Sequence, residues 1–464
     1  MTPIALPKEW DHETDIIIVG AGTAGLPAAM LAKAAGAEVV VLESTKSMGG
    51  SGCLIMAGGA FAGTSYQKKL GIEDSPEQLY KDGIEIAEGT PEIWRAYADN
   101  QLDTFEWLLS IGCKPSVEDK LIMPPGHRAA RLHVYEGMKA MATIERAAKE
   151  KEVDIRLGHR AKRLIYDFEN DRVVGIAVQV KNKLKYFKAR KGILLATGGF
   201  GRNKEMISEY GRRFVDCIPL MAPGHKGDGL KMSLDLGAAT QDIGNSVVAS
   251  LAACTTTHSD RGYFAVMAGG IAVNVNGERF YDESCPKGYY GHLTDAGMDQ
   301  PGKVFWFIYD SLIRDVWMVA PHVKSWKSFE GNTYEELAEN AGLNAENFAA
   351  CVNRYNEDIE SEGSDTVLGR KFLTMAGGEL QTLSTPPYYA IKCETSITSF
   401  KGGLKLNSRF QVVNVYGEPI RGLYAAGEVA GGLFSKGAYM GGVNWASSMT
   451  NGRVAVRNLC FENA

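Results

Sequence analysis

The chain has 464 residues, 45% of them hydrophobic, so it is longer than one hydrophobic core usually grows and should form two domains. A formal net charge of -5 excludes a protein that is drawn as a whole to nucleic acid or to an anionic membrane. The eight cysteines lie far apart without a CxxC pair, which argues against a zinc or iron–sulfur motif and against a disulfide framework.

The amino-terminal stretch MTPIALPKEWDHETD carries acidic residues and lacks the apolar segment of a signal peptide. The sequence also lacks a run of about 18 apolar residues that would predict a membrane helix. We therefore expect a soluble, cytoplasmic protein. One basic run, KNKLKYFKARK at 181–191, alternates cationic and apolar residues before a hydrophobic strand. We interpret it as the solvent face of a hairpin rather than a nucleic-acid site.

Residues 15–43 give the clearest prediction. An apolar strand leads into Gly20-x-Gly22-x-x-Gly25, an alanine-rich helix follows, and a second strand ends in Glu43. The glycines allow a tight turn and the close approach of a pyrophosphate, the helix start offers free N–H groups, and the carboxylate can accept from ribose hydroxyls. This order predicts a dinucleotide site. Because Glu43 would repel a 2'-phosphate, NADP is disfavoured.

Three more glycine clusters lie beside apolar strands further along the chain. They are GGSGCLIMAGGAFAG at 49–63, ILLATGGF at 193–200 and LYAAGEVAGGLF at 423–434. Glycine clusters bring backbone close to a ligand or turn it where a Cβ would not fit. Three further approaches suit a long cofactor with two ring systems, which indicates FAD rather than NAD.

The sequence resembles the FAD-dependent fumarate reductase and succinate dehydrogenase flavoprotein superfamily. The resemblance rests on the ordered segments above together with GDGLKMSLDLGA (227–238), NGERFYDE (276–283) and PPYYAIK (386–392), and it covers nearly the whole chain. It implies an α/β fold with a Rossmann-like FAD-binding domain of the glutathione-reductase type. That domain would comprise residues 1–243 and 386–464, with an α+β cap domain, 244–385, inserted between them.

Within the expected cap, residues 334–359 have helical periodicity. One stripe of this segment is apolar, and we expect it to be core rather than part of a cofactor site. Its members are Leu337, Ala341, Phe348, Val352 and Tyr355. The resemblance implies that the cap closes over the flavin, so that the substrate lies between the two domains.

The resemblance also implies cofactor roles for matching positions. Gly20, Gly22 and Gly25 would face the pyrophosphate, and Glu43 the adenosine ribose. Ala161 would meet the adenine through its backbone, and Glu428 would bind ribityl hydroxyls. The other positions assigned to FAD are Ala24, Ser44, Gly50, Ser51, Ala57, Gly58, Gly59, Ala196, Thr197, Gly198, Gly227, Asp228, Gly427, Gly442 and Val443.

Attachment of the cofactor can also be predicted. Relatives that bind FAD covalently do so through a histidine in the segment after the second strand. Here that segment reads SGCLIMAGG, 51–59, and has no histidine. We interpret Cys53 as a small buried thiol, so we expect dissociable FAD and no metal.

The chain departs from fumarate reductases in segments where those enzymes carry substrate-binding residues, arginine among them. Their HTMGG is matched by SFKGG at 399–403, and their NRLGG by AYMGG at 438–442. An arginine that those enzymes usually carry shortly after the NGERFYDE-type strand is also absent, because ESCPKGYYGH at 283–292 offers Lys287, Tyr289 and Tyr290 instead. We therefore do not expect a dianionic, succinate-like substrate.

The remaining pattern resembles the 3-ketosteroid dehydrogenases, especially the 4-ene-forming branch. By position, Tyr290 or Tyr289 would be the acid/base, Tyr439 would donate to the substrate carbonyl, and a backbone N–H of Gly441 or Gly442 would stabilise the oxyanion. That branch carries a serine where this chain has Gly441, which puts a proton relay through that hydroxyl in doubt. His258 and His292 are alternative proton donors.

We therefore expect an FAD-dependent oxidoreductase that acts on a C–C bond next to a ketone in a hydrophobic, steroid-like ring compound. Two alternatives stay open. One is an unsaturated-acid reductase of the fumarate or urocanate type that uses Lys287 or Lys401 in place of arginine. The other is a non-catalytic flavoprotein or electron-transfer subunit. The electron donor or acceptor leaves no mark in the sequence.

Overall fold

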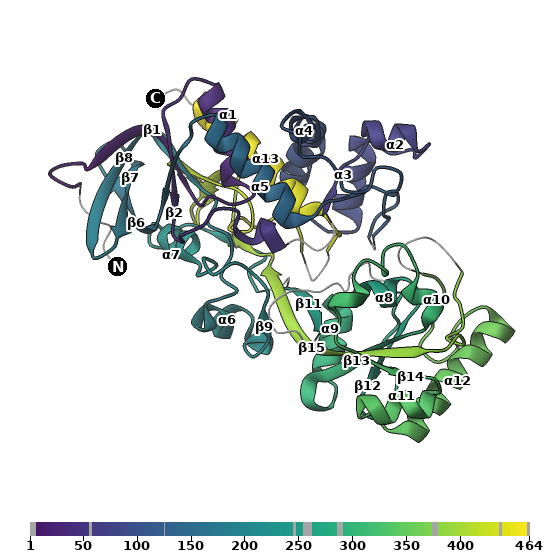
Figure 1. Ribbon diagram of the computed structural model, residues 1–464. Coiled ribbons are helices and arrows are strands. Elements are labelled where there is room, and N and C mark those ends of the chain that lie inside the picture. The colour runs from purple at the N-terminus through teal and green to yellow at the C-terminus, as the bar shows by residue number, and fades with distance from the viewer. Residues whose placement is uncertain are drawn as a thin grey trace.

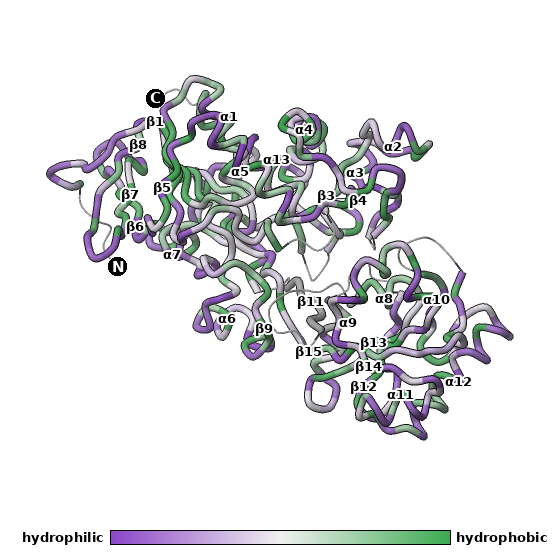
Figure 2. The backbone as a smooth tube through the Cα atoms, in the orientation of Figure 1, coloured by the Kyte–Doolittle hydropathy of each residue, from purple (hydrophilic) through white to green (hydrophobic). Residues whose placement is uncertain are grey.

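The computed structural model describes residues 6–54, 58–124, 126–244, 247–253, 262–284, 291–373, 379–435 and 439–461. Figure 1 shows two lobes, each built around a sheet, and the long strand β15 (Tyr388–Phe400) that extends from one toward the other. We call the lobe with the larger sheet the first lobe and the other the second lobe. Figure 2 shows that hydrophobic residues gather in the strands of the first-lobe sheet, whereas hydrophilic residues lie at the periphery.

The first-lobe sheet has eight strands. Its main path, in spatial order, runs β17 (Gln411–Val413), β18 (Pro419–Ala425), β8 (Lys183–Leu195), β1 (His12–Val19), β2 (Val39–Glu43) and β5 (Asp154–Leu157). Every neighbouring pair is parallel except β17 and β18. The central strand β1 buries three consecutive isoleucines, Ile16 to Ile18, as expected for a parallel strand covered on both faces. The predicted α/β fold is confirmed.

The basic run lies in a hairpin, as predicted. Strands β6 (His159–Asp167) and β7 (Arg172–Val180) continue the sheet, and β7 pairs antiparallel with the first half of β8. The turn passes through Lys181, whose φ is 52°. Lys183 and Leu184 beyond the turn are exposed, whereas the four residues that end β8 are buried. The cationic part of the run therefore faces solvent.

Helices and short strands complete the first lobe. The helices are α1 (Gly25–Ala34), α2 (Ser65–Lys69), α3 (Pro76–Glu85), α4 (Pro91–Ser110), α5 (Gly137–Glu150), α6 (Lys204–Tyr210), α7 (Asp228–Leu234) and α13 (Val443–Cys460). The paired short strands are β3 (Gly58–Ala60) with β4 (Leu132–Val134), and β10 (Thr240–Gln241) with β16 (Gly403–Leu404). Helices α1 and α13 pack closely, since a Cβ at Gly452 would lie 2.5 Å from the carbonyl oxygen of Ala24.

The second-lobe sheet is mostly antiparallel. Its main path is β11 (Val247–Ala253), β15, β13 (Val304–Tyr309) and β12 (Ile271–Asn274), while β14 (Ser328–Gly331) and β9 (Ile218–Pro219) also pair with β15. The helices of this lobe are α8 (Tyr263–Met267), α9 (Gly291–Met298), α10 (Ser311–Arg314), α11 (Tyr334–Ala341) and α12 (Ala345–Glu362). Because β15 belongs to this sheet, the predicted domain boundary at 386 falls just before a strand of the second lobe. The predicted boundaries stay a prediction.

The periodic segment 334–359 forms two helices rather than one. Helix α11 ends at Gly342, whose φ of 73° is accessible to glycine without strain, and Asn344 caps α12 by accepting from the N–H of Asn347 at 3.0 Å. All five residues of the predicted stripe are buried in the second-lobe core, which confirms that interpretation.

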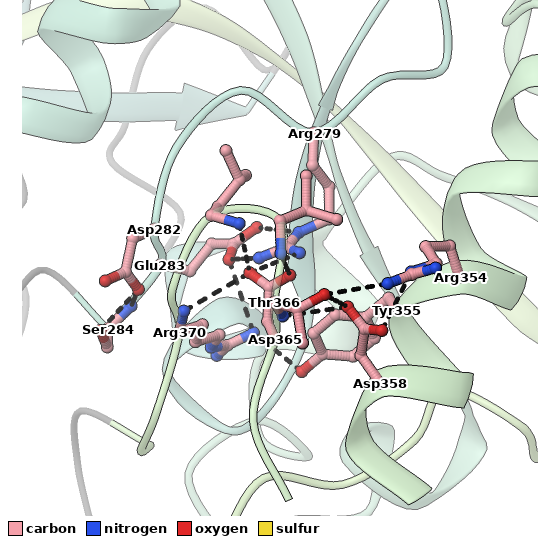
Figure 3. A network of polar contacts seen from close by, with 12 residues as sticks. Arg279, Asp282, Glu283, Ser284, Arg354, Tyr355, Asp358, Asp365, Thr366 and Arg370 are labelled. Atoms are coloured by element: carbon pink, nitrogen blue, oxygen red, sulfur yellow. Dashed lines mark hydrogen bonds and ion pairs between the residues drawn. The ribbon is translucent and has the colours of Figure 1, made fainter. Parts of the chain in front are cut away.

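A buried ion network crosses the second lobe (Figure 3). Arg279 lies 2.9 Å from Asp365 and donates to Glu283 at 3.0 Å. Glu283 also accepts from the N–H of Ala272 at 2.9 Å. Arg370, fully buried, donates to carbonyl oxygens at the end of α8 and in the turn after it, those of Val266 at 3.0 Å and Gly270 at 2.8 Å. We call Arg279, Glu283, Asp365 and Arg370 the second-lobe ion network.

None of the helices in the described ranges combines the length and apolarity needed to cross a bilayer. The described His, Cys, Asp and Glu side chains form no group of three or more that could hold a metal ion.

Candidate active site

A cavity of about 830 Å³ is lined by residues of both lobes. The first lobe supplies the loop after β1, the turn after β2, and the starts of α7 and α13. The second lobe supplies Phe264 and Met267 of α8. Three of the four glycine clusters predicted to approach a cofactor, those after β1, β8 and β18, meet along this one cavity together with part of the fourth, at 50–54 and 58.

Glu43, the last residue of β2, anchors the glycine-rich loop that follows β1. Its carboxylate accepts from the N–H of Ala21 at 3.0 Å and from the N–H of Thr45 at 2.8 Å. These two bonds hold the carboxylate where it lines the cavity, beside the start of α1. The loop and the acid are therefore positioned together, as the dinucleotide pattern requires.

The glycines of that loop explain how the cofactor fits. A Cβ at Gly25 would lie 1.9 Å from the carbonyl oxygen of Gly20, so Gly25 is needed for helix-to-loop packing. A Cβ at Gly22 would meet only the carbonyl oxygen of Gly49, at 4.0 Å, and Gly22 lines the cavity. The open space at Gly22 is a cradle that a side chain would fill, and it suits the pyrophosphate of FAD.

Most predicted cofactor positions line the cavity. They are Gly20, Gly22, Ala24, Glu43, Ser44, Gly50, Ser51, Gly58, Ala161, Ala196, Thr197, Gly198, Asp228, Gly427, Glu428 and Gly442. Gly25, Gly59, Gly227 and Val443 do not line it; they pack behind it. Ala57 lies outside the described residues, as do Tyr289 and Tyr290. The individual roles of these residues stay predictions.

Asp228 has a partner that the sequence did not indicate. Both of its carboxylate oxygens accept from Arg160 of β6, each at 2.8 Å, in a two-pronged ion pair. Arg160 precedes Ala161, so this pair joins the start of α7 to the strand expected near the adenine. The carboxylate therefore has a structural role whether or not it also meets the cofactor.

Glu428 follows β18 and accepts from the N–H of Phe400 at 3.1 Å. Its other oxygen lies 3.4 Å from Nδ1 of His225, and Nε2 of His225 lies 2.9 Å from the hydroxyl of Ser51. Ser51, His225 and Glu428 all line the cavity. Sequence reasoning missed His225, although it stands two residues before the Gly227-Asp228 pair that the resemblance singled out.

Lys401 is a second base beside Glu428. It follows β15 and is 5% exposed, and its ammonium lies 5.9 Å from the ring centre of Tyr439 and 6.0 Å from that of Phe434. Burial lowers its pKa to about 8, and the charge of Glu428 partly opposes this effect. We call Ser51, His225, Glu428 and Lys401 the Glu428 cluster.

Tyr439 lies on the cavity wall next to the start of α13. Its ring packs against Phe434, with 5.1 Å between the ring centres. Burial and the charge of Glu428 raise the pKa of the phenol, so the side chain is a neutral hydrogen-bond donor at neutral pH. Helix α13 starts after Gly442, whose φ is 77°; the N–H of Val443 donates to the carbonyl oxygen of Met440 at 3.3 Å, and the first N–H groups of the helix have no partner within it.

Apolar side chains surround the part of the cavity that α8 lines. Phe264 and Met267 come from the second lobe, and Ile122, Pro124 and Leu132 come from the segment around β4. Among the described lining residues, the positively charged side chains are Lys46 and Lys149. Lys46 lies in the turn after Glu43, and Lys149 lies on α5, whose chain leads into β5 beside β2. These lysines belong to the Glu43 part of the wall.

Cys53 lines the cavity and is half-buried, which corrects its interpretation as a small buried thiol. Burial raises its pKa, and the charge of Glu145 raises it further. The thiolate needed for covalent attachment is therefore disfavoured. Dissociable FAD stays a prediction.

Comparisons with known proteins agree with this architecture. A family model described as "FAD binding domain" matches residues 15–444. A probable fumarate reductase of Shewanella frigidimarina is 32% identical over 458 residues, which cover 96% of this chain and 74% of that protein. The solved open conformation of a flavocytochrome c3 fumarate reductase superposes with a TM-score of 0.82 at 30% identity, covering 97% of this chain and 78% of that one.

A steroid enzyme is also similar. The 3-ketosteroid Δ4-(5α)-dehydrogenase of Rhodococcus jostii RHA1, solved with 4-androstene-3,17-dione, superposes with a TM-score of 0.78 at 26% identity, and the match covers 100% of both chains. The matching family model, the similar proteins and the glycine-lined cavity agree on the cofactor. The chain belongs to the FAD-binding domain family and is an FAD-dependent oxidoreductase of the fumarate reductase superfamily.

Proposed function

We propose that this protein adds or removes hydrogen across a C–C bond next to a ketone in an apolar ring compound of the steroid type. The observation that carries the proposal is a cavity lined both by a neutral phenol, Tyr439, at the position where fumarate reductases carry arginine, and by the apolar side chains beside α8. A flat, uncharged ring system with one carbonyl group matches such a lining. Similarity to the Rhodococcus steroid enzyme supports the same substrate class.

Bound FAD supplies the two-electron chemistry. Tyr439 donates a hydrogen bond to the substrate carbonyl oxygen and stabilises the negative charge that develops there. The N–H groups at the start of α13, near Gly442, add to that stabilisation, since they have no partner within the helix. Phe264 and Met267 cover the substrate and exclude water, which strengthens both interactions.

A proton must also move at the carbon next to the carbonyl. Tyr290, or its neighbour Tyr289, takes this role in the proposal, and both lie outside the described residues. Tyr439 does not serve as the base, because its raised pKa keeps the phenol protonated. Hydrogenation and dehydrogenation use the same groups in reverse, so the geometry is compatible with both directions.

The second candidate is reduction of an unsaturated acid. The probable fumarate reductase of Shewanella frigidimarina favours it, as does the buried ammonium of Lys401 near Tyr439. A dicarboxylate carries two charges, however, and arginine is absent from the described lining residues. One ammonium is a weak substitute for the two-pronged binding that guanidinium gives a carboxylate.

The two candidates differ in which compound re-oxidises the reduced enzyme. FAD should be reduced anaerobically and then mixed with 4-androstene-3,17-dione, fumarate or urocanate while flavin absorbance is followed. We expect recovery of the oxidised spectrum with the enone alone. Recovery with fumarate or urocanate and none with the enone would establish the second candidate. No recovery with any of a wider set of unsaturated ketones and acids would indicate a non-catalytic flavoprotein.

A further inference from the structure

The Glu428 cluster contains a chain of hydrogen-bonding groups, Ser51, His225 and Glu428, that the proposed chemistry does not use. The N–H of Ala222 donates to the hydroxyl oxygen of Ser51 at 2.9 Å. Ser51 is therefore free to donate its own proton to Nε2 of His225, 2.9 Å away. That assignment leaves the imidazole proton on Nδ1, which faces Glu428 at 3.4 Å.

His225 is a neutral base in this arrangement. Burial lowers the pKa of His225. The charges of Glu428 and Glu43 oppose this effect, whereas those of Lys401 and Arg202 lower the pKa further. Its side chain is 8% exposed, and the second oxygen of Glu428 is already engaged by the N–H of Phe400. A small change in the local charge can therefore decide whether the imidazole carries a proton.

The change in charge comes from the cofactor. Ser51, His225 and Glu428 line the cavity that the family fills with FAD, so reduction adds negative charge next to a buried neutral imidazole. We propose that His225 binds a proton from solvent when FAD in this cavity is reduced. When a two-electron donor such as dithionite reduces FAD, one proton passes from solvent to Nε2 of His225; Nε2 then donates to the hydroxyl oxygen of Ser51, and the hydroxyl hydrogen of Ser51 turns away from His225.

This proposal rests on FAD binding and not on the identity of the substrate. Its consequence is a redox potential that depends more steeply on pH, because each proton taken up with two electrons shifts the midpoint by about 30 mV per pH unit. Protonated His225 also stabilises the reduced cofactor. The enzyme would therefore accept electrons more readily as the pH falls.

The test compares midpoint potentials by anaerobic dithionite titration with indicator dyes at several pH values between 6 and 9. We expect the midpoint potential of the wild-type protein to fall by about 30 mV more per pH unit than that of H225Q, which corresponds to one extra proton per two electrons. H225N, whose amide reaches toward Glu428 instead of Ser51, should match H225Q. Flavin absorbance and thermal unfolding establish that each variant is folded and holds FAD.

Two controls separate His225 from its neighbours. His159 lines the same cavity, but among the described residues its hydrogen-bond partner is the carbonyl oxygen of Leu157 and not Ser51 or Glu428, so H159N should keep the wild-type slope. K405M, at an exposed position, should also keep it. Equal slopes in wild type and H225Q, or loss of the steeper slope in H159N, would overturn the proposal.

A measurement on the unmodified protein covers the case in which both His225 variants fail to fold. Reduction in weakly buffered solution at pH 8, followed with a pH indicator, should take up one more proton per FAD than reduction of free FAD. Equal uptake would overturn the proposal independently of any variant and of the substrate tests.

Discussion

The protein contains two buried clusters of charge, and they differ in how completely the charges are paired. In the second-lobe ion network, Arg279 sits between two carboxylates, and Arg370 binds backbone carbonyl groups (Figure 3). In the Glu428 cluster, the carboxylate of Glu428 is the one acidic group beside two bases, His225 and Lys401. The ammonium of Lys401 faces aromatic rings. Only the second cluster supplies cavity-lining residues.

The difference teaches what each cluster can do. A buried guanidinium between two carboxylates keeps one protonation state, because burial raises the cost of an unpaired charge, so the network fixes the second lobe in one arrangement. Neutral His225 and a lysine with a lowered pKa can each change protonation near neutral pH. Strong pairing stabilises structure, whereas incomplete pairing beside the cofactor leaves charge available for chemistry.

The largest effect is expected from removing the central cation of the second-lobe ion network. R279A leaves Glu283 and Asp365, both with fully buried side chains, without their main partner. We expect a loss of about 3–5 kcal/mol in the free energy of unfolding, measured by urea denaturation. R354A is the matched control, since Arg354 is 58% exposed where it meets Asp358 and should cost less than about 1 kcal/mol. Similar losses in both variants would contradict the comparison.

Removing the buried cation of the Glu428 cluster should have the opposite effect and raise the free energy of unfolding. Burial lowers the pKa of Lys401 from 10.5 to about 8, so between these values the unfolded chain binds more protons and the lysine's contribution to stability rises with pH. K401M removes the cost of burying the charged ammonium. It should therefore raise the free energy of unfolding by up to about 3 kcal/mol at pH 7, with little difference from wild type above pH 10.5.

The stabilisation is expected because Glu428 keeps the N–H of Phe400 and His225 as partners in K401M. Urea unfolding at pH 7 and at pH 10.5 measures it, and K405M, at an exposed position, is the control. If K401M is instead less stable than wild type at pH 7, the ammonium holds Glu428 in place and the cluster resembles the second-lobe ion network.

A smaller effect, on turnover rather than stability, is expected at the phenol beside this cluster. Y439F removes a donor to the developing oxyanion and should lower kcat by about 100-fold while FAD stays bound. Stopped-flow flavin re-oxidation by the enone measures it, and Y416F, at a tyrosine that is 85% exposed, should behave as wild type. Unchanged kcat in Y439F would return Tyr439 to a packing role.

The local parts of the fold could be predicted from the sequence. The strand, glycine turn, helix and acid of 15–43 follow from short-range pattern, and so does the hairpin through Lys181. The break between α11 and α12 was missed, although Gly342 and Asn344 carry the signal for it. Periodicity extends across such a break because both helices bury their apolar face in one core.

The chemistry beside the cofactor could be predicted only in part. Sequence reasoning found Glu428 and Tyr439 because each stands in a motif, but it missed His225 and the apolar wall from Phe264 and Met267. These residues come from distant segments of the chain, and no local pattern specifies which of them meet. Asp228 was likewise assigned without its partner Arg160, which β6 supplies.

The sequence by itself determined the FAD frame, since glycine positions and hydrophobic periodicity act over a few residues and fix backbone geometry locally. Tertiary structure alone decided the protonation properties of the site. A histidine becomes a neutral base, and a lysine a cation with a lowered pKa, only where packing removes water and brings one carboxylate to both.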